Sequence, residues 1–410
     1  MPDYSAPKGM RDFLPDEAAK RERAIEAIKR TYRKFGFVPM DTPALESVEV
    51  LERKCGEEIK GQLFRVDDGR TALRFDLTVP LSRVASSNTF KKPFKRYCIA
   101  PVWRREEPQK GRFREFYQAD ADIIGCPTVR AEAELIACAC SAISGLGFSG
   151  ATVLLNDRRI ITAIAASLLS GKESAVLRIL DKREKIGDAA CVEMLAAAGA
   201  REKDAKKLLS DLAAAKTNAE ALSVAEKYSK EGAESLKELL FLVKEYGKYD
   251  VKIDLSLVRG LDYYTGAIFE ITLGKEMGSV AGGGRYDNLL SMYGQADSAV
   301  GISLGFERLM VLMGARAPEK RGVFVAAAKD EFYSYALSVA AKLRAAGIEC
   351  QTDLNARSLK KQMDYAAICC RFIAVVGERE KKEGKVTLRD LESGKEEMLT
   401  VEEVAKRASA

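Results

Sequence analysis

Hydrophobic and polar residues alternate with two different periods along the first part of the chain. Apolar positions recur with helical spacing over residues 16–35, which predicts an amphipathic helix that stops at Gly36. The following segment, GFVPMDTPALES, is predicted to be extended because its two prolines do not fit a helix interior. Between about 62 and 125, short runs alternate as antiparallel strands do, and a helix at about 128–145 and a strand at ATVLLN follow.

The rest of the chain changes pattern three times. Residues 158–246 are rich in Ala, Leu, Lys and Glu at helical spacing, which predicts a helical insertion. Strand patterns return at 251–273 and 278–284, and the segment GISLGFERLMVLMG that follows has the period of a core helix. After the polar, proline-containing linker ARAPEKRG, strands and helices alternate over 322–410, as in a small α/β domain.

Composition places the chain among multidomain globular proteins. Its 410 residues are 47% hydrophobic, enough to bury two or three cores. The formal charge of +6 is spread among interleaved acids and bases, so it argues only weakly for nucleic-acid binding. No signal sequence or membrane-length apolar run is visible, so we expect a cytoplasmic protein that does not bind membranes. Nine cysteines without a CxxC pair are expected to be reduced, mostly buried thiols.

The chain contains no histidine at all. Imidazole catalysis, histidine metal ligands and Ser-His or Cys-His nucleophilic pairs are therefore excluded. Any chemistry must use arginine, lysine, carboxylates, tyrosine or groups of the substrate itself.

The stretch RREEPQKGRFREFYQADAD, residues 104–122, is either a solvated run of charges or a binding site. Pro-Gln-Lys-Gly between two alternating runs predicts a hairpin tip. Strand period then places six residues on one face of the second strand: Arg112, Arg114, Phe116, Gln118, Asp120 and Asp122. If this face were buried in a core, its charged side chains would pack poorly. If it were solvated, the aromatic ring of Phe116 would be exposed to water without need. A binding face is therefore the favoured interpretation.

Three further segments carry candidate chemistry, although each has an ordinary interpretation on its own. LVRGLDYYTGAIFEI (257–271) could be a strand with normal tyrosine packing, and AGGGRYDNL (281–289) a glycine-rich hairpin. In GISLGFERL (301–309), the glycines would begin a helix with Arg308 in its first turns, where an arginine is usually a surface ion pair. A GxGxxG match at 145–150 follows a helix and precedes a strand, the reverse of the dinucleotide-binding order, so it is interpreted as a turn.

These segments, in this order and followed by a small α/β domain, resemble class II aminoacyl-tRNA synthetases and specifically the histidyl-tRNA synthetase family. GFVPMDTPALES resembles motif 1, which forms the dimer interface in the family. VWRREEPQKGRFREFYQADADIIG resembles motif 2, and GISLGFERL resembles motif 3. LVRGLDYYTG and AGGGRYDNL resemble the two signatures that separate histidyl enzymes from other class II members.

The resemblance implies an α+β fold with a class II synthetase-like antiparallel sheet, flanking helices, a helical insertion and a C-terminal α/β anticodon-binding domain. The expected parts are the first part of the catalytic domain (1–157), the insertion (158–246), the second part of the catalytic domain (247–314), a linker (315–321) and the anticodon-binding domain (322–410). The insertion is expected to touch the acceptor arm of the tRNA.

The resemblance also implies an ATP site with three catalytic arginines. Arg104 would hold the α-phosphate, Arg259 would approach it and the substrate carboxylate from the other side, and Arg308 would stack on adenine and reach the γ-phosphate. Phe116 would lie under the base, with Glu106 near its exocyclic amine. Mg²⁺ would bridge the phosphates mostly through ligand oxygens and water, so no protein metal ligand is named. Permanent cations suit this chemistry because negative charge gathers on phosphoryl oxygens.

For histidine, the resemblance points to LRFDLTVP, where Asp76, Leu77 and Thr78 would bind the amino acid and its ammonium group, with help from Gln118. Asp122 and Tyr264 would read the two imidazole nitrogens. The rest of the expected histidine site is Arg104, Arg259, Tyr263 and Tyr286. At the hairpin tip, the expected contacts with the tRNA acceptor end are Lys110, Arg112 and Arg114.

The expected function is therefore activation of L-histidine by ATP and its transfer to tRNA(His) by a homodimer. The main alternative is a non-catalytic regulatory paralogue of the ATP phosphoribosyltransferase type, which normally lacks the C-terminal domain. A tRNA-sensing module with a dead site and a prolyl or threonyl enzyme are further alternatives. At three positions where the family often has histidine, this chain has Arg105, Tyr117 and Asp157.

Two hypotheses follow from the missing histidines. A phosphate oxygen of the substrate would accept the proton in the transfer step. The absence of histidine would itself be selected, so that the enzyme is still translated when free histidine runs out.

Overall fold

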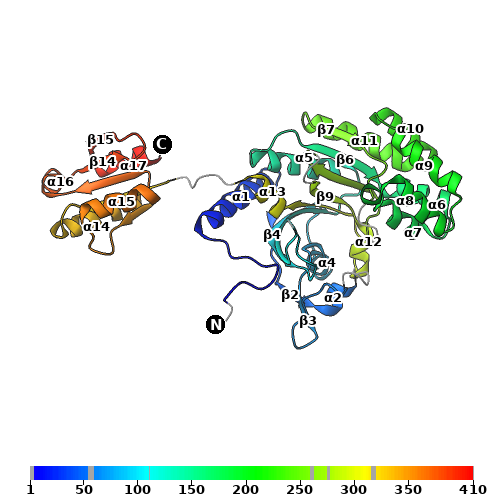
Figure 1. The fold of residues 1–410 in the computed structure, drawn as a ribbon, viewed down its shortest axis with the longest axis horizontal. Helices are drawn as coiled ribbons and strands as arrows, with labels where there is room; N and C mark the ends of the chain where they lie inside the picture. The colour runs from blue at the N-terminus through cyan, green and yellow to red at the C-terminus, as the bar shows by residue number, and fades with distance from the viewer. Residues whose placement is uncertain are drawn as a thin grey trace. The chain divides into compact units, whose positions relative to one another are not determined.

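The chain folds into two compact units, residues 1–314 and 315–410 (Figure 1). The computed structural model describes residues 4–53, 60–109, 111–258, 263–274, 278–314 and 320–409. The units divide after Gly314, where the sequence pattern predicts the start of a linker. Most of that linker, 315–319, lies outside the described residues.

An eight-stranded sheet organises the first unit. Its strand order is β1-β4-β5-β10-β9-β8-β6-β7, antiparallel except for a parallel pair at each edge. The strands are β1 (Val38–Pro39), β4 (Phe94–Trp103), β5 (Glu115–Ile124), β6 (Thr152–Asp157), β7 (Asp250–Ile253), β8 (Ala267–Thr272), β9 (Ser279–Arg285) and β10 (Ala299–Gly305). The predicted antiparallel sheet with flanking helices is confirmed.

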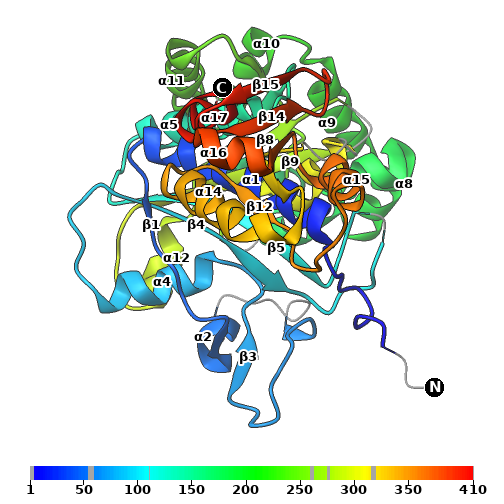
Figure 2. The same ribbon diagram turned by 90° about the vertical axis from the view of Figure 1, so that its left-hand side faces the viewer.

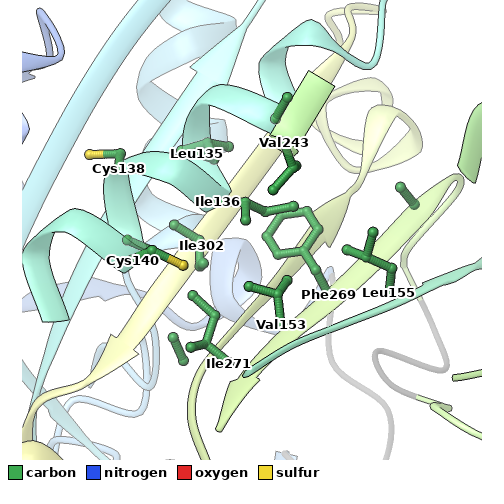
Figure 3. Packing of buried hydrophobic residues seen from close by; sticks show 14 of the residues in the cluster. Leu135, Ile136, Cys138, Cys140, Val153, Leu155, Val243, Phe269, Ile271 and Ile302 are labelled. Atoms are coloured by element: carbon green, nitrogen blue, oxygen red, sulfur yellow. The ribbon is translucent and has the colours of Figure 1, made fainter. Parts of the chain in front are cut away.

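Three helices pack on one face of this sheet and form the main core: α1 (Pro15–Lys34), α5 (Arg130–Gly145) and α11 (Lys230–Tyr246). Figure 3 shows apolar side chains of α5 meeting sheet residues such as Phe269 and Ile302. The other face carries α4 (Thr78–Ser87) and α12 (Asp287–Met292), which share a smaller apolar cluster. The sheet is thus covered by helices on one side and only partly covered on the other.

Strand period divides the central strand β5 between these two faces. Ala119, Ala121 and Ile123 join the core under the helices. The intervening residues Phe116, Gln118, Asp120 and Asp122 line a cavity on the opposite face. The predicted alternation is confirmed from Phe116 onward, whereas Arg112 and Arg114 precede the strand, which begins at Glu115.

Residues 158–246 are helical, as predicted: α6 (Arg158–Leu168), α7 (Glu173–Leu180), α8 (Arg183–Ala197), α9 (Glu202–Ala214), α10 (Asn218–Tyr228) and α11. Helices α6 to α9 share a core of their own, but α11 packs on α5 over the sheet. No single helix in the described ranges is long and apolar enough to span a membrane; the bent pair α6 and α7 passes that test only by length and composition.

Two stretches differ from the sequence prediction. GISLGFERLMVLMG is not one helix: its first residues belong to β10, and the helix α13 spans only Phe306–Leu312. Apolar residues two apart within a longer helical pattern fit both periods, and the central place in the sheet decides for strand. LFRVDD forms only an isolated bridge at Arg65. The small sheet of β2 (Leu45–Ser47) and β3 (Thr71–Leu73) lies beside α2 (Val48–Glu52) (Figures 1 and 2).

The second unit is an α/β domain with a five-stranded sheet in the order β12-β11-β13-β14-β15. Strands β11, β12 and β13 are parallel because helices connect them, while β14 and β15 add antiparallel edges. Its elements are β11 (Val323–Ala327), η1 (Asp330–Phe332), α14 (Tyr333–Ala345), β12 (Cys350–Thr352), α15 (Leu359–Cys369), β13 (Phe372–Val376), α16 (Glu378–Glu383), β14 (Val386–Asp390), β15 (Glu396–Leu399) and α17 (Val401–Ser409).

Candidate active site

A cavity of about 460 Å³ opens on the polar face of the large sheet. Its walls come from the α4 N-terminus, β5, β9, β10, α13, the hairpin between β4 and β5, and three tyrosines at 263, 264 and 286. Twelve of the residues expected from the sequence line it: Asp76, Thr78, Arg104, Glu106, Arg112, Phe116, Gln118, Asp122, Tyr263, Tyr264, Tyr286 and Arg308. Residues scattered over more than two hundred positions therefore share one cavity.

Asp122 is held by two buried partners. Its Oδ2 lies 2.8 Å from the Arg96 guanidinium, directly opposite it on β4, and its Oδ1 accepts a 2.5 Å hydrogen bond from the Tyr286 hydroxyl. Arg96 and Asp122 are 1% and 2% exposed. A charge removed from water to this extent requires an opposite charge or hydrogen bonds. The sequence did not point to Arg96, which lies in an ordinary strand pattern.

Three tyrosines form an aromatic wall above this pair. The ring centroids of Tyr263 and Tyr264 are 4.4 Å apart, and Tyr263 meets Tyr286 edge-on at 6.3 Å. Burial raises the pKa of Tyr263 to about 12 and that of Tyr286 well above its ordinary value. These phenols therefore keep their protons at neutral pH and can donate hydrogen bonds.

The segment before α4 places Asp76 and Thr78 at the cavity. Asp76 Oδ1 accepts a hydrogen bond from the Val79 amide at 2.9 Å, so the carboxylate also caps the helix. The Leu77 side chain is 2% exposed and packs in a core cluster with Val102, away from the cavity lining. Leu77 therefore anchors the segment, and its carbonyl accepts from Arg96 at 3.0 Å.

Asp120 and Gln118 are two further acceptors on the same strand face. Ser303 lies on β10 directly opposite Asp120, and its hydroxyl hydrogen-bonds the Asp120 carboxylate. The same hydroxyl accepts a 3.1 Å hydrogen bond from Gln118 Nε2. Asp120 Oδ1 and Gln118 Oε1 are buried without a hydrogen-bond partner among the described residues. Burial, and then the nearby Asp122 charge, raises the pKa of Asp120 to about 7. Strand parity placed Asp120 on this face, but no role was predicted for it.

Three arginines line the cavity: Arg104, Arg112 and Arg308. Arg104 Nε donates to the Phe75 carbonyl at 3.0 Å, and its guanidinium lies 5.2 Å from the Phe116 ring centroid. Arg308 donates to the Ser279 carbonyl. Burial and the nearby Arg112 charge lower the pKa of Arg308. Like charges placed together in a cavity indicate a polyanionic ligand.

The hairpin tip is attached to the N-terminal segment and to α13. Gln109 and Arg112 form a bridge at the tip, as a hairpin predicts. The Arg11 guanidinium lies 3.4 Å from the Phe113 ring centroid and pairs with Glu307 at 2.6 Å. Arg114 does not line the cavity; its Nε donates to the Glu106 carbonyl at 3.0 Å. The sequence did not reveal the role of the N-terminal segment in this arrangement.

Glycines allow the strands and the carboxylates to approach closely. A Cβ on Gly301 would lie 2.1 Å from Asp122 Oδ1, and one on Gly283 would lie 2.1 Å from the Gly301 carbonyl oxygen. The three glycines at 282–284, interpreted from the sequence as a glycine-rich hairpin, belong to β9, where Gly282 alone of the three lines the cavity. Close strand packing, more than ligand access, explains the run.

Two of the predicted site residues, Arg259 and Lys110, lie outside the described residues. The residues that the sequence reading missed are Arg96, Ser303, Glu307 and Phe113, along with any role for Asp120. Strand alternation within 299–305 would have placed Ser303 on the cavity face, but this segment was interpreted as a helix.

A mostly antiparallel sheet with a cavity of arginines, carboxylates and tyrosines, followed by a small α/β domain, defines a class II aminoacyl-tRNA synthetase. A family model described as histidyl-tRNA synthetase matches residues 9–309, and one described as anticodon binding domain matches 322–410. The chain belongs to the histidyl-tRNA synthetase family.

Individual relatives match over nearly the full length. The chain is 34% identical to a histidine-tRNA ligase of Cytophaga hutchinsonii, covering 98% of both chains. It is 37% identical to one of Aeropyrum pernix, covering 98% of this chain and 96% of the relative. The crystal structure of histidyl-tRNA synthetase from Nostoc sp. PCC 7120 superposes with a TM-score of 0.87 at 28% identity, covering 100% of this chain and 99% of that one.

Proposed function

We propose that the chain catalyses the ligation of L-histidine to tRNA(His). ATP would activate histidine to histidyl-adenylate with release of pyrophosphate, and the histidyl group would then pass to the 3′ end of the tRNA. One observation carries the proposal: a single cavity is lined by arginines together with carboxylates and tyrosines. Identity to histidine-tRNA ligases over nearly the full length supports it.

For the histidine end, we assign Asp122 and Tyr264 to the imidazole ring and Asp76, Thr78 and Gln118 to the ammonium group. Asp122 suits this role because Arg96 and Tyr286 hold it in one position. A site of fixed polar groups discriminates strongly, since a competitor without ring nitrogens leaves those groups unpaired. Tyr263 and Tyr286 would enclose the ring, and Arg104 and Arg259 would bind the substrate carboxylate.

For the nucleotide end, we assign the α-phosphate to Arg104 and Arg259, and the adenine and γ-phosphate to Arg308. Phe116 is available to stack beneath the base, and Glu106 lines the same cavity. Within the described ranges, no group of three or more acidic or cysteine side chains is arranged to hold a metal ion. We therefore propose that Mg²⁺ enters as the MgATP complex, coordinated mainly by phosphate oxygens and water.

We assign recognition of the tRNA to two places. The hairpin tip, with Lys110, Arg112 and Arg114, would contact the acceptor end, and the second unit would bind the anticodon. A homodimer is proposed from the resemblance of residues 36–47 to motif 1, where the apolar side chains Val38 and Leu45 are 48% and 46% exposed. The helical segment 158–246 would touch the acceptor arm.

In the transfer step the ribose hydroxyl must lose a proton. The chain has no histidine, and two cavity carboxylates are already engaged, Asp122 by Arg96 and Glu307 by Arg21. We propose that a phosphate oxygen of the adenylate accepts the proton. Single-turnover transfer from preformed adenylate tests this, because a carboxylate variant that loses transfer but keeps activation would contradict it.

Pyrophosphate exchange with each of the twenty amino acids in turn tests the function. Histidine alone is expected to support exchange. Exchange with another amino acid would assign the chain to a different synthetase. No exchange at all would favour the regulatory alternative, which the second unit and the cavity arginines argue against.

A further inference from the structure

Charges around the carboxylates of the cavity do not balance. Three aspartates line it, Asp76, Asp120 and Asp122. Arg96 neutralises Asp122, and Asp76 caps a helix whose positive end favours a carboxylate. Asp120 forms no ion pair with any described residue, although it is only 3% exposed. Asp120 is therefore a buried carboxyl group of the cavity whose partner is not a cation of the described residues.

Asp120 also has an oxygen without a protein partner. Ser303 engages the carboxylate, but Oδ1 is buried and accepts no hydrogen bond from the described residues. A buried acceptor without a hydrogen bond is unfavourable, so such an atom calls for a partner that the protein does not supply, such as a water or a ligand. Because Oδ1 belongs to a residue that lines the cavity, the ligand in the cavity is the natural partner.

The spacing along β5 suits an amino acid with a polar ring. Gln118, Asp120 and Asp122 are successive residues of one strand face, so each lies about 6.7 Å from the next along the strand. Gln118 Oε1 is the second buried acceptor without a partner. L-Histidine has donors at both ends, an ammonium group and a ring N–H, and would lie along this row.

We propose that Asp120 Oδ1 binds the same ring nitrogen as Asp122, which leaves the other nitrogen to Tyr264, and that the site holds histidine with one proton shared between Asp120 and that ring nitrogen. The inference rests on the proposed function, since it needs histidine as the substrate. It adds a specificity-determining residue to the pair, Asp122 and Tyr264, that the family resemblance assigned to the ring.

The surroundings of Asp120 explain why it is able to share a proton. Burial and the adjacent Asp122 raise its pKa to about 7, with a smaller contribution from Asp76, while Arg96 and the Ser303 hydroxyl lower it. The other titratable groups near it are Cys98, Tyr32 and Tyr263, and burial raises the pKa of each, so they stay neutral near pH 7. Asp120 is thus the group in this set that titrates close to the imidazole pKa of about 6.5.

A shared proton gives histidine binding a defined pH dependence. Above both pKa values neither group carries the proton, so binding must take one up and weakens about tenfold per pH unit. Below both pKa values each group carries a proton, so binding must release one. Affinity is therefore expected to peak near pH 7. Asp120→Asn removes the proton uptake and should flatten the alkaline side.

The test is the KM for histidine in pyrophosphate exchange between pH 6 and 8.5. For the wild type we expect KM to rise about tenfold per unit above pH 7.5, and for Asp120→Asn to stay nearly level, with the KM for ATP similar in both. Calorimetry of histidine binding at pH 8, in buffers of different ionisation enthalpy, should show about one more proton taken up by the wild type. The matched control is Asp157→Asn, because Asp157 is fully buried but caps α6 outside the cavity.

The possible outcomes separate the two proposals. Absence of histidine-dependent exchange in the wild type would refute the function itself. If the wild type supports exchange but Asp120→Asn keeps the same pH dependence and the same proton uptake, only the role of Asp120 would be refuted. If Asp120→Asn does not fold, Ser303→Ala serves instead: loss of the hydroxyl should raise the Asp120 pKa and move the alkaline decline to higher pH, and an unmoved decline would count against the proposal.

Discussion

The ion pair between Glu307 and Arg21 offers a quantitative test of how the first unit holds its N-terminal helix. Arg21 lies on α1 and Glu307 on α13, and two hydrogen bonds of 2.9 and 2.8 Å join them. Their side chains are 7% and 6% exposed. The guanidinium also lies 3.8 Å from the Phe13 ring centroid. We consider Glu307→Gln, which keeps the shape but removes the charge.

The expected cost follows from burial. Removing one partner of a buried pair leaves the other charge without compensation, at about 3–5 kcal/mol. The pair between Lys8 and Glu107, 2.9 Å apart, provides the matched control because its side chains are 68% and 72% exposed. Exposed pairs contribute up to about 1 kcal/mol, so Glu107→Gln should cost little.

Fluorescence provides a suitable measurement because the single tryptophan, Trp103, lies on β4 in the first unit. Urea unfolding followed at Trp103 therefore reports on the unit that contains both pairs. At pH 7 we expect a large fall in the unfolding midpoint for Glu307→Gln and a small one for Glu107→Gln. Added salt should reduce only the effect at the exposed pair.

The pH dependence follows from the pKa of Glu307. Burial alone would raise this pKa, but hydrogen bonds and charges of Arg21 and Arg11 outweigh burial and lower it. The stabilisation is therefore complete above the unfolded pKa of about 4.3 and disappears as pH falls through the lower, folded value. Equal costs for the two variants at pH 7, or a cost at Glu307 that grows on acidification, would refute this reasoning.

Three further outcomes are expected. Arg104→Lys should slow pyrophosphate exchange about 100- to 1000-fold, because it removes donors that stabilise charge in the transition state. The control is Arg105→Lys, which should change the rate little because Arg105 does not line the cavity. Gly301→Ala should displace the Asp122 carboxylate and raise the KM for histidine at least about tenfold, with the KM for ATP much less affected. The control is Gly145→Ala, because a Cβ at this position would meet only the Thr31 hydroxyl, at 3.6 Å. Circular dichroism and steady-state kinetics compare the two variants. Iodoacetamide at pH 8 should spare three buried thiols whose pKa values burial raises, as peptide mass spectrometry would show: Cys98, Cys138 and Cys140.

The local pattern of hydrophobic and polar residues was sufficient to predict the features that depend on the strand period or the helix period. Alternation along residues 116–122 placed Gln118, Asp120 and Asp122 on one face, because a strand offers only two faces to its side chains. The helical character of 158–246 and the α/β alternation after 322 followed in the same way. The family signatures added which residues to look for, and most of them lie around one cavity.

The amino-acid sequence was enough to establish the period of most elements, the chemistry available to a chain without histidine, and the order of its motifs. The neighbours of each strand became known from the folded structure, because pairing partners depend on packing across the whole sheet. The folded structure placed Arg96 opposite Asp122, brought Ser303 of β10 to Asp120, and joined Glu307 to Arg21, 286 residues away. Buried charges need partners wherever the chain supplies them, and these partners lie far apart in the sequence but adjacent in the sheet and its helices.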